Sequence, residues 1–162
     1  MSGYWPPPRP IQTKAIAGFY ASEKAGNRRI CVTMPTGTGK TYVAAALADE
    51  FLRSGLRVSL YCHRVALMEQ LSREMRKFGL DHGVRAAGFK DEREKPFQLC
   101  SIQTIDARTR RREEHKAEAL DDAGLVIVEE CHLLSGEVMS AVVNAVLSTV
   151  TPRTRLALLD HI

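Results

Sequence analysis

Apolar positions along this chain follow two different periods, which predict two kinds of secondary structure. Short runs that are apolar at nearly every position, such as Leu-Val-Ile-Val at 125–128, predict strands buried on both faces of a sheet. The strands expected from such runs span residues 29–34, 57–62, 84–87, 97–102, 125–128 and 155–159.

Longer stretches between these runs have the spacing or the composition of helices. The helices expected from them span residues 11–24, 41–54, 65–78, 106–123 and 137–150. Strands and helices therefore alternate along the chain. This alternation predicts a parallel, doubly wound α/β sheet in three layers.

The length and the apolar content of the chain indicate a single folding unit. Of its 162 residues, 44% are hydrophobic, which is enough for one sizeable core. Trp5 is followed by three prolines, which predict a stiff, extended lead-in at 1–10. We therefore expect one domain at 11–162.

Composition restricts the class and the compartment of the protein. The net charge of +4 and the pI near 9.0 are compatible with a nucleic-acid partner, but they are weak evidence alone. The four cysteines are far apart, which predicts reduced thiols rather than a disulfide framework or a zinc site. No segment approaches the roughly 18–20 apolar residues of a membrane span, so we expect a cytoplasmic protein with no membrane partner.

A glycine-rich segment joins the strand expected at 29–34 to the helix expected at 41–54. It consists of Pro35, Thr36, Gly37, Thr38, Gly39, Lys40 and Thr41. Its end fits the phosphate-binding pattern G-x-x-x-x-G-K-[ST], although Met34 stands where that pattern begins with glycine. The segment is therefore the candidate site for ATP and Mg2+.

The residue types in this segment suit a nucleoside triphosphate. Gly37 and Gly39 allow backbone N–H groups to close around phosphate oxygens, and the following helix directs its positive N-terminus at the same anion. Lys40 is expected to reach the β- and γ-phosphates, and the Thr41 hydroxyl is expected to bind magnesium. A plain strand-to-helix turn is the alternative, which Gly-Lys-Thr at the start of a helix disfavours.

The sequence Met-Pro-Thr-Gly-Thr-Gly-Lys-Thr at 34–41 resembles motif I of the superfamily 2 helicases, in which the first glycine is commonly absent. The wider chain is similar to the DEAD/DEAH-type branch that includes type III restriction enzyme helicase subunits and phage helicases. This resemblance implies a RecA-like P-loop domain with ATPase or helicase activity, using ATP and Mg2+.

Two further segments resemble helicase motifs. The sequence Arg-Pro-Ile-Gln at 9–12 is similar to the family's arginine-proline-x-glutamine element, which implies that Arg9 and Gln12 belong to the nucleotide site and that Gln12 reads the adenine edge. His63 and Arg64 resemble motif Ia, which implies contacts to a nucleic-acid backbone. A capping or surface glutamine and a solvated His-Arg pair are the alternatives.

The sequence Ser-Ile-Gln-Thr at 101–104 resembles the family's S-x-Q-T element, which follows a strand. The resemblance implies that Gln103 and Thr104 contact phosphate or sugar. A threonine at the end of a strand also suits a helix cap, and the two roles are compatible.

Glu129, Glu130 and His132 follow an apolar strand and resemble motif II, which is usually Asp-Glu-x-His. The resemblance implies that Glu129 holds magnesium through water and that Glu130 deprotonates the attacking water. It also implies that His132 couples the nucleotide site to the nucleic-acid site. Glu129 replaces the family's aspartate, and its extra methylene moves the carboxylate on the order of 1 Å. Because magnesium tolerates poor octahedral geometry badly, we expect weak hydrolysis.

The strand expected at 155–159 is the one that leads into motif III in this family, but Asp160, His161 and Ile162 follow it here. We therefore expect motif III and the second motor domain to be absent from this chain. Another chain could supply that second RecA-like domain.

These observations predict the first RecA-like motor domain of a superfamily 2 helicase, which binds Mg-ATP and a nucleic-acid backbone, with DNA favoured over RNA. A second hypothesis is a non-catalytic, nucleotide-dependent nucleic-acid-binding module, because Glu129 and the missing domain both weaken hydrolysis. A P-loop kinase or a transporter ATPase is a third hypothesis. It leaves 101–104 and His132 unexplained, and the chain has neither a lid nor an ABC-type signature.

Overall fold

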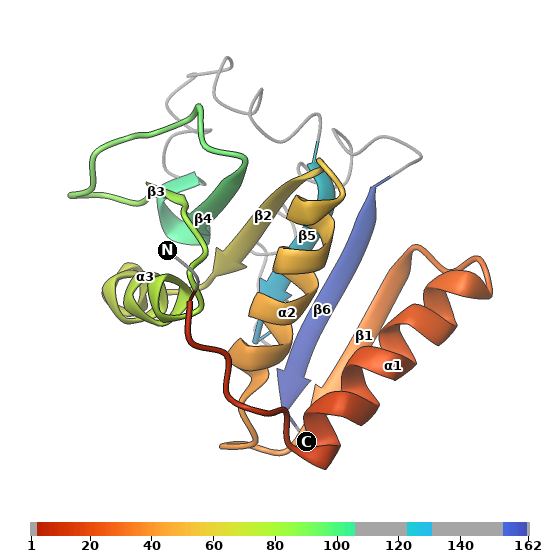
Figure 1. The fold of residues 1–162 in the computed structure, drawn as a ribbon. Helices are drawn as coiled ribbons and strands as arrows, with labels where there is room; N and C mark the ends of the chain where they lie inside the picture. Colours follow the sequence, from red (N-terminus) through yellow and green to blue (C-terminus); the bar gives the residue numbers. More distant parts are fainter. Residues whose placement is uncertain (1–2, 106–122, 131–153, 162) are drawn as a thin grey trace.

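The computed structural model describes residues 3–105, 123–130 and 154–161, which form a six-stranded sheet with helices against it (Figure 1). The strands are β1 (Arg29–Met34), β2 (Arg57–Cys62), β3 (Gly83–Arg85), β4 (Phe97–Ser101), β5 (Ala123–Glu129) and β6 (Arg155–His161). Their order is β1-β6-β5-β2-β4-β3, and each pair of neighbours runs parallel. The parallel α/β sheet expected from the alternating elements is therefore confirmed.

The place of each strand in the sheet explains its pattern of side chains. β2, β4 and β5 lie inside the sheet, and nearly all of their side chains are buried, as their apolar runs predict. β1 lies at one edge, and only alternate residues, Ile30, Val32 and Met34, are buried.

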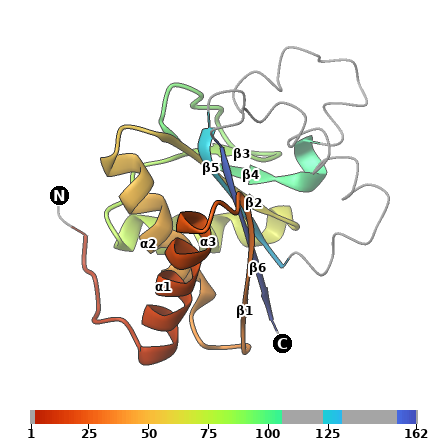
Figure 2. The ribbon, with the colours of Figure 1, turned by 90° about the vertical axis from the view of Figure 1, so that its right-hand side faces the viewer.

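Three helices share one hydrophobic core with the sheet, and Figure 2 shows α1 and α2 on the same side of it. The helices are α1 (Pro10–Lys24), α2 (Lys40–Arg53) and α3 (Met68–Lys77). Ala123, the last residue of the helix expected at 106–123, begins β5 instead. The rest of that helix and the helix expected at 137–150 lie outside the described residues. None of the described helices is long and apolar enough to cross a membrane.

The segment 65–78, which was expected to be one helix, differs from that prediction at its start. It begins with a 3₁₀ turn, η1 (Val65–Leu67), in which the Leu67 N–H donates to the Arg64 carbonyl at 3.1 Å. The α-helix starts only at Met68. Short 3₁₀ turns are frequent at helix ends, and apolar periodicity does not distinguish them from α-helix.

The strands expected at 84–87 and 97–102 end earlier than predicted, because side chains take over the hydrogen bonds of the backbone. The Ala87 N–H donates to the Thr104 hydroxyl at 3.1 Å instead of continuing β3. The Ser101 hydroxyl accepts the Thr104 N–H at 3.4 Å, where helical backbone begins at 102. The first bond joins the ends of β3 and β4, and the second turns the chain at the end of β4.

The lead-in before α1 packs against α2 and α3. The Tyr4 N–H donates to the Lys77 carbonyl at 2.9 Å. The Trp5 ring lies 4.6 Å from the Phe78 ring and 5.7 Å from the Tyr42 ring, measured between ring centres. In Figure 1 this segment therefore runs from α3, past α2, to the start of α1.

The carboxyl ends of the strands lie at one edge of the sheet. The register places Cys62 of β2 beside Ser101 of β4, and Glu129 of β5 beside Leu159 of β6. The loop after β1 lies at the same edge (Figure 1). Open α/β sheets bind ligands along this edge. Four of the segments expected to bind ligands lie at strand ends or shortly after them here, at residues 35–39, 63–64, 103–104 and 129–130, whereas Arg9 and Gln12 lie at the start of α1.

Candidate functional site

The loop at 35–39, between β1 and α2, is a tight turn whose first residues are exposed. Gly37 and Gly39 have φ angles of 75° and 86°, which a side chain would strain. The Thr38 hydroxyl donates to the Pro35 carbonyl at 2.6 Å and closes the turn. α2 begins directly after the loop, so its first N–H groups and its positive end lie there. This arrangement suits a bound anion such as phosphate.

Arg9 and Gln12, at the start of α1, brace this loop. Gln12 is only 5% exposed, and its amide donates to the Thr38 carbonyl at 2.9 Å and to the Gly39 carbonyl at 3.4 Å. The Gln12 amide oxygen accepts the Arg9 N–H at 2.8 Å, and the Arg9 guanidinium donates to the Gly37 carbonyl at 3.4 Å. The structure thus places both residues at the loop, while the adenine contact of Gln12 stays a prediction.

Gly39 is needed for packing as well as for its backbone angle. A Cβ atom at this position would collide with Nε2 of Gln12. Alanine here would therefore displace the side chain that supports the loop. Lys40 and Thr41 follow in the first turn of α2, and both are half-buried.

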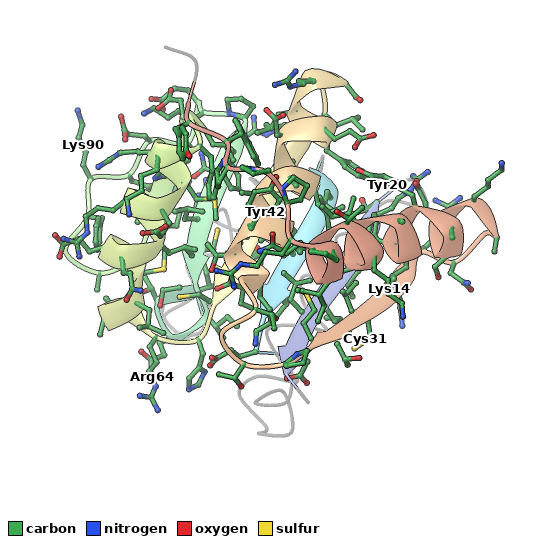
Figure 3. All side chains as sticks on the ribbon, turned by 60° about the horizontal axis from the view of Figure 1, so that its bottom comes forward. Lys14, Tyr20, Cys31, Tyr42, Arg64 and Lys90 are labelled. Atoms are coloured by element: carbon green, nitrogen blue, oxygen red, sulfur yellow. The ribbon has the colours of Figure 1, made fainter. Side chains whose placement is uncertain are left out.

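A cleft of about 420 Å³ opens beside the loop, between the lead-in, α2 and α3. Gly39 and Thr41 line it on the side of the loop, and Tyr42 and Glu74 line it farther away. In the view of Figure 3, Tyr42 lies between α3 and α1. Small-molecule sites commonly have volumes of about 300–1,000 Å³, so the cleft can hold a nucleoside.

Glu129, at the end of β5, is half-buried and carries a polar atom that no described residue satisfies. Its Oε1 is inaccessible to solvent and accepts no hydrogen bond from the described part of the chain. Burial, and then the neighbouring Glu130, raises the pKa of Glu129 to about 7, while Lys40 opposes the shift. Such an atom costs free energy unless a donor or a cation meets it, so it fits a bound cation. α2, which begins at Lys40, packs against β5.

Glu130 follows β5 and is exposed. Its φ angle is 56°, and no other non-glycine residue in the described ranges has a positive φ. A side chain in this conformation costs roughly 1–2 kcal/mol, and strain of this kind is concentrated at functional sites. This strain supports a functional role for Glu130. His132 lies outside the described residues.

His63 and Arg64 follow β2 at the same edge. Arg64 is exposed, and Figure 3 shows its side chain extending away from the molecule. His63 is half-buried, and its Nδ1 meets no hydrogen-bond partner among the described residues. The Cys62 thiol donates to the Arg64 carbonyl at 3.2 Å and holds the turn. The turn suits contact with phosphate, and that contact stays a prediction.

Gln103 and Thr104 follow β4, but they differ in availability. Gln103 is exposed, whereas Thr104 is 8% exposed and its hydroxyl already accepts the Ala87 N–H. The structure therefore gives Thr104 a supporting role in addition to any contact with a ligand. Gln103 is the more accessible of the two for a nucleic acid.

A comparison with protein families identifies the kind of domain that carries this site. The sequence model of the type III restriction enzyme, res subunit, matches residues 6–158. This chain belongs to that family. This match confirms the resemblance seen in the motifs. The chain is a helicase-type domain. No curated protein matches it.

Solved structures confirm the RecA-like fold of this chain. The UvsW helicase from bacteriophage T4 matches with a TM-score of 0.69 at 19% identity, over 98% of this chain and 54% of that chain. The Sulfolobus solfataricus SWI2/SNF2 ATPase core in complex with dsDNA matches with a TM-score of 0.70 at 17% identity, over 98% and 33%. A hypothetical ATP-dependent RNA helicase from Sulfolobus tokodaii matches with a TM-score of 0.69 at 15% identity, over 97% and 46%. The chain thus spans about a third to a half of these structures.

Some side chains that line the cleft away from the loop were not predicted from the sequence. These are Tyr42, in the first turn of α2, and Gln70 and Glu74, on α3. The spacing of Gln70 and Glu74 by four residues places them on one face of a helix. No feature of the sequence indicates that this face turns toward the loop.

Proposed function

We propose that this chain is the first RecA-like motor domain of a superfamily 2 helicase. It binds Mg-ATP at the loop between β1 and α2 and contacts a nucleic-acid backbone along the carboxyl edge of the sheet. The observation that carries the proposal is the buried Glu129 oxygen, unsatisfied within the described residues and under the influence of Lys40. A plain strand-to-helix turn would need neither the braced loop nor this carboxylate.

Each residue around the loop has a role in this proposal. Backbone N–H groups of 35–39 bind phosphate oxygens, and Lys40 neutralises the β- and γ-phosphates. Thr41 and Glu129 hold the magnesium ion, which would neutralise charge on the phosphates and orient them. Among the described residues no three His, Cys, Asp or Glu side chains form a metal-binding group, so phosphate and water would supply the other oxygens. The Glu130 carboxylate accepts the proton of the attacking water.

The nucleic acid is proposed to lie against the turns after β2 and β4. Arg64 and Gln103 are exposed there, and His63 is half-buried beside them. Such side chains bind phosphate without reading sequence. The restriction-enzyme family and the dsDNA bound by the similar SWI2/SNF2 core favour DNA, while the similar hypothetical RNA helicase makes RNA the alternative to test. His132 is proposed to couple this surface to the nucleotide.

Hydrolysis by these 162 residues alone is expected to be slow. In motors of this kind the nucleotide lies between two RecA-like domains, and an arginine from outside the first domain contributes roughly 10³–10⁵ in rate. The second domain is proposed to complete the nucleotide site. Adding that domain should therefore raise turnover more than it raises the affinity for ATP.

The test is Mg-ATP binding and steady-state ATP hydrolysis, with and without single-stranded DNA or RNA. Lys40→Ala should weaken Mg-ATP binding at least about tenfold, because it removes a buried charge contact to phosphate. Lys24→Ala, which changes an exposed lysine in the last turn of α1, at the opposite end of the helix from Gln12, is the matched control and should bind like the wild type. Absence of binding in the wild type, or equal binding by Lys40→Ala, would contradict the proposal.

A non-catalytic, nucleotide-dependent binding module is the second candidate, and Glu129 favours it because its carboxylate is one methylene longer than aspartate. DNA-stimulated turnover by the wild type would support the motor. Binding of Mg-ATP without turnover would support the module. The Glu129→Asp variant then tests the cause, since a gain in turnover assigns the loss to the position of that carboxylate.

A further inference from the structure

The cleft beside the phosphate-binding loop takes its farther polar side chains from α3. Both ends of the Gln12 amide are already engaged by the backbone of Thr38 and Arg9. The amide oxygen keeps one lone pair, so Gln12 can offer a base one further acceptor and no more. Gln70 and Glu74 lie one helical turn apart on α3 and line the same cleft, with Gln70 exposed and Glu74 half-buried.

The Glu74 carboxylate is held in place but retains room to accept another hydrogen bond. Its Oε1 accepts a hydrogen bond from Lys77 Nζ at 2.6 Å. Within the part of the chain that the structure describes, no second side chain bonds to this carboxylate. The Lys77 ammonium orients the group and leaves Oε2 as an acceptor.

Aromatic side chains form the apolar part of the cleft. Tyr42 and Phe78 both line it, and their ring centres lie 5.7 Å apart with an interplanar angle of 85°. Trp5 packs against both rings. Flat aromatic surfaces next to a directed acceptor are the features that bind a planar heterocycle.

We propose that Glu74 is a specificity-determining residue, whose carboxylate accepts a hydrogen bond from the exocyclic amino group of adenine when the nucleotide phosphates occupy the loop. This inference rests on the proposed function, because it places the base by reference to the phosphates. Gly39 and Thr41 line the cleft together with Glu74, so the phosphate subsite at the loop and the proposed base subsite open into the same cleft.

The preference for adenine follows from what a carboxylate can do. An ionised carboxylate only accepts hydrogen bonds, so it favours an amino group and repels a carbonyl oxygen at the same place. Adenine carries an amino group where hypoxanthine carries oxygen. Gln70 has an amide that can both donate and accept, so it does not discriminate between these bases.

The alternative is that Glu74 serves only the ion pair with Lys77. Exposed ion pairs on a helix surface contribute little to stability. Such a pair would be indifferent to the base of a bound nucleotide. Base selectivity is therefore the readout that separates the two roles.

The experiment measures the dissociation constants of MgADP and MgIDP by isothermal titration calorimetry for the wild type, Glu74→Gln and Glu69→Gln. Glutamine has nearly the shape of glutamate, and its amide can donate to the hypoxanthine oxygen. Glu69 is exposed on the same helix but does not line the cleft, so Glu69→Gln is the matched control. Trp5, the only tryptophan of the chain, reports binding independently by its fluorescence.

The wild type and Glu69→Gln should prefer MgADP about tenfold, and Glu74→Gln should lose or reverse that preference. An unchanged preference in Glu74→Gln, or none in the wild type, would overturn the inference while leaving the nucleotide site intact. Failure of the wild type to bind either nucleotide, or binding that is unaffected by Lys40→Ala, would instead overturn the proposed function. Circular dichroism and thermal melting of each variant confirm that it is folded.

Discussion

At the scale of single residues, the loop at 35–41 is supported by a side chain that lies far from it along the chain, that of Gln12. The loop at 35–41 was predictable because phosphate binding depends on contiguous glycine, lysine and threonine. The brace formed by Gln12 was not, because its partner Thr38 lies 26 residues away along the chain. Thr104 shows the same limit, since its bond to Ala87 spans 17 residues.

The brace leads to a prediction that separates it from base recognition. Gln12→Ala removes the hydrogen bonds to the Thr38 carbonyl and the Arg9 N–H, and it leaves buried groups unpaired. We expect the affinity for magnesium tripolyphosphate, which has no base, to fall about tenfold, in parallel with the affinity for Mg-ATP. Calorimetric titration with both ligands measures this.

Thr13→Ala is the control for the Gln12 prediction, because Thr13 is exposed on the same turn of α1. It should bind both ligands like the wild type. If Gln12→Ala weakened Mg-ATP but left tripolyphosphate unchanged, Gln12 would act on the base rather than on the loop.

At the scale of secondary structure, periodicity predicted each described strand and both ends of β1 and β2, but it missed ends of the other strands and did not predict which strands are neighbours. β3 and β4 end early because Ser101 and Thr104 replace backbone partners with side-chain hydroxyls. The order of the sheet places β6 between β1 and β5, although β6 comes last along the chain. Such an order depends on burial across the whole sheet, and Arg155, at 2.6 Å from Glu23, helps to hold β6 beside α1.

The connection between α3 and β3 depends on a buried histidine. His82 is 2% exposed, and its two ring nitrogens lie 2.8 Å from the Ser72 hydroxyl and 2.8 Å from the Leu80 carbonyl. A carbonyl only accepts, so Nδ1 carries the proton and Nε2 accepts from Ser72. The neutral ring therefore satisfies both partners.

This histidine predicts a loss of stability in mild acid. Burial lowers the pKa of His82 below 6.5, with Arg76 and Lys95 adding to the effect and the Leu80 carbonyl and Asp81 opposing it. Below pH 6.5 the unfolded chain therefore binds a proton that the folded chain does not. The free energy of unfolding should fall as the pH falls from about 7.5 to 5.5, by up to about 1.4 kcal/mol per pH unit from this group.

Urea unfolding of the wild type and His82→Gln at both pH values tests the acid effect. The variant should lose less stability between the two values than the wild type does. Glu129, whose raised pKa gives the opposite sign in this range, is present in both proteins and cancels in the difference. Equal losses in the two proteins would show that His82 does not cause the effect.

At the scale of the whole molecule, one sheet carries the segments 35–39, 63–64, 103–104 and 129–130 of the proposed site on a single edge. The fold class could be predicted because alternating apolar runs and helices allow few arrangements. The cleft could not be predicted, since it forms where the lead-in, α2 and α3 meet. A ligand that binds this assembled edge and not the unfolded chain must stabilise the entire sheet.

Cysteine reactivity measures that coupling between the site and the fold. Cys31 is exposed on the edge strand β1, whereas Cys62 on β2 and Cys100 on β4 are buried. Burial raises the pKa of Cys62 to about 11 and that of Cys100 to about 12, so neither thiol is ionised in the folded protein near pH 8. Alkylation with iodoacetamide, followed by peptide mapping, should label Cys31 quickly and the buried pair only when the protein unfolds.

Mg-ATP should slow the alkylation of the buried thiols but not that of Cys31. At a concentration of about 100 times its dissociation constant, a ligand lowers the unfolded fraction about a hundredfold. Cys62 lies near the site and a nucleotide could shield it directly, so Cys100 is the decisive reporter. If Cys100 slowed while Cys31 did not, nucleotide binding would be linked to the stability of the whole sheet. If Cys100 were alkylated at an unchanged rate, this part of the sheet would open independently of the site.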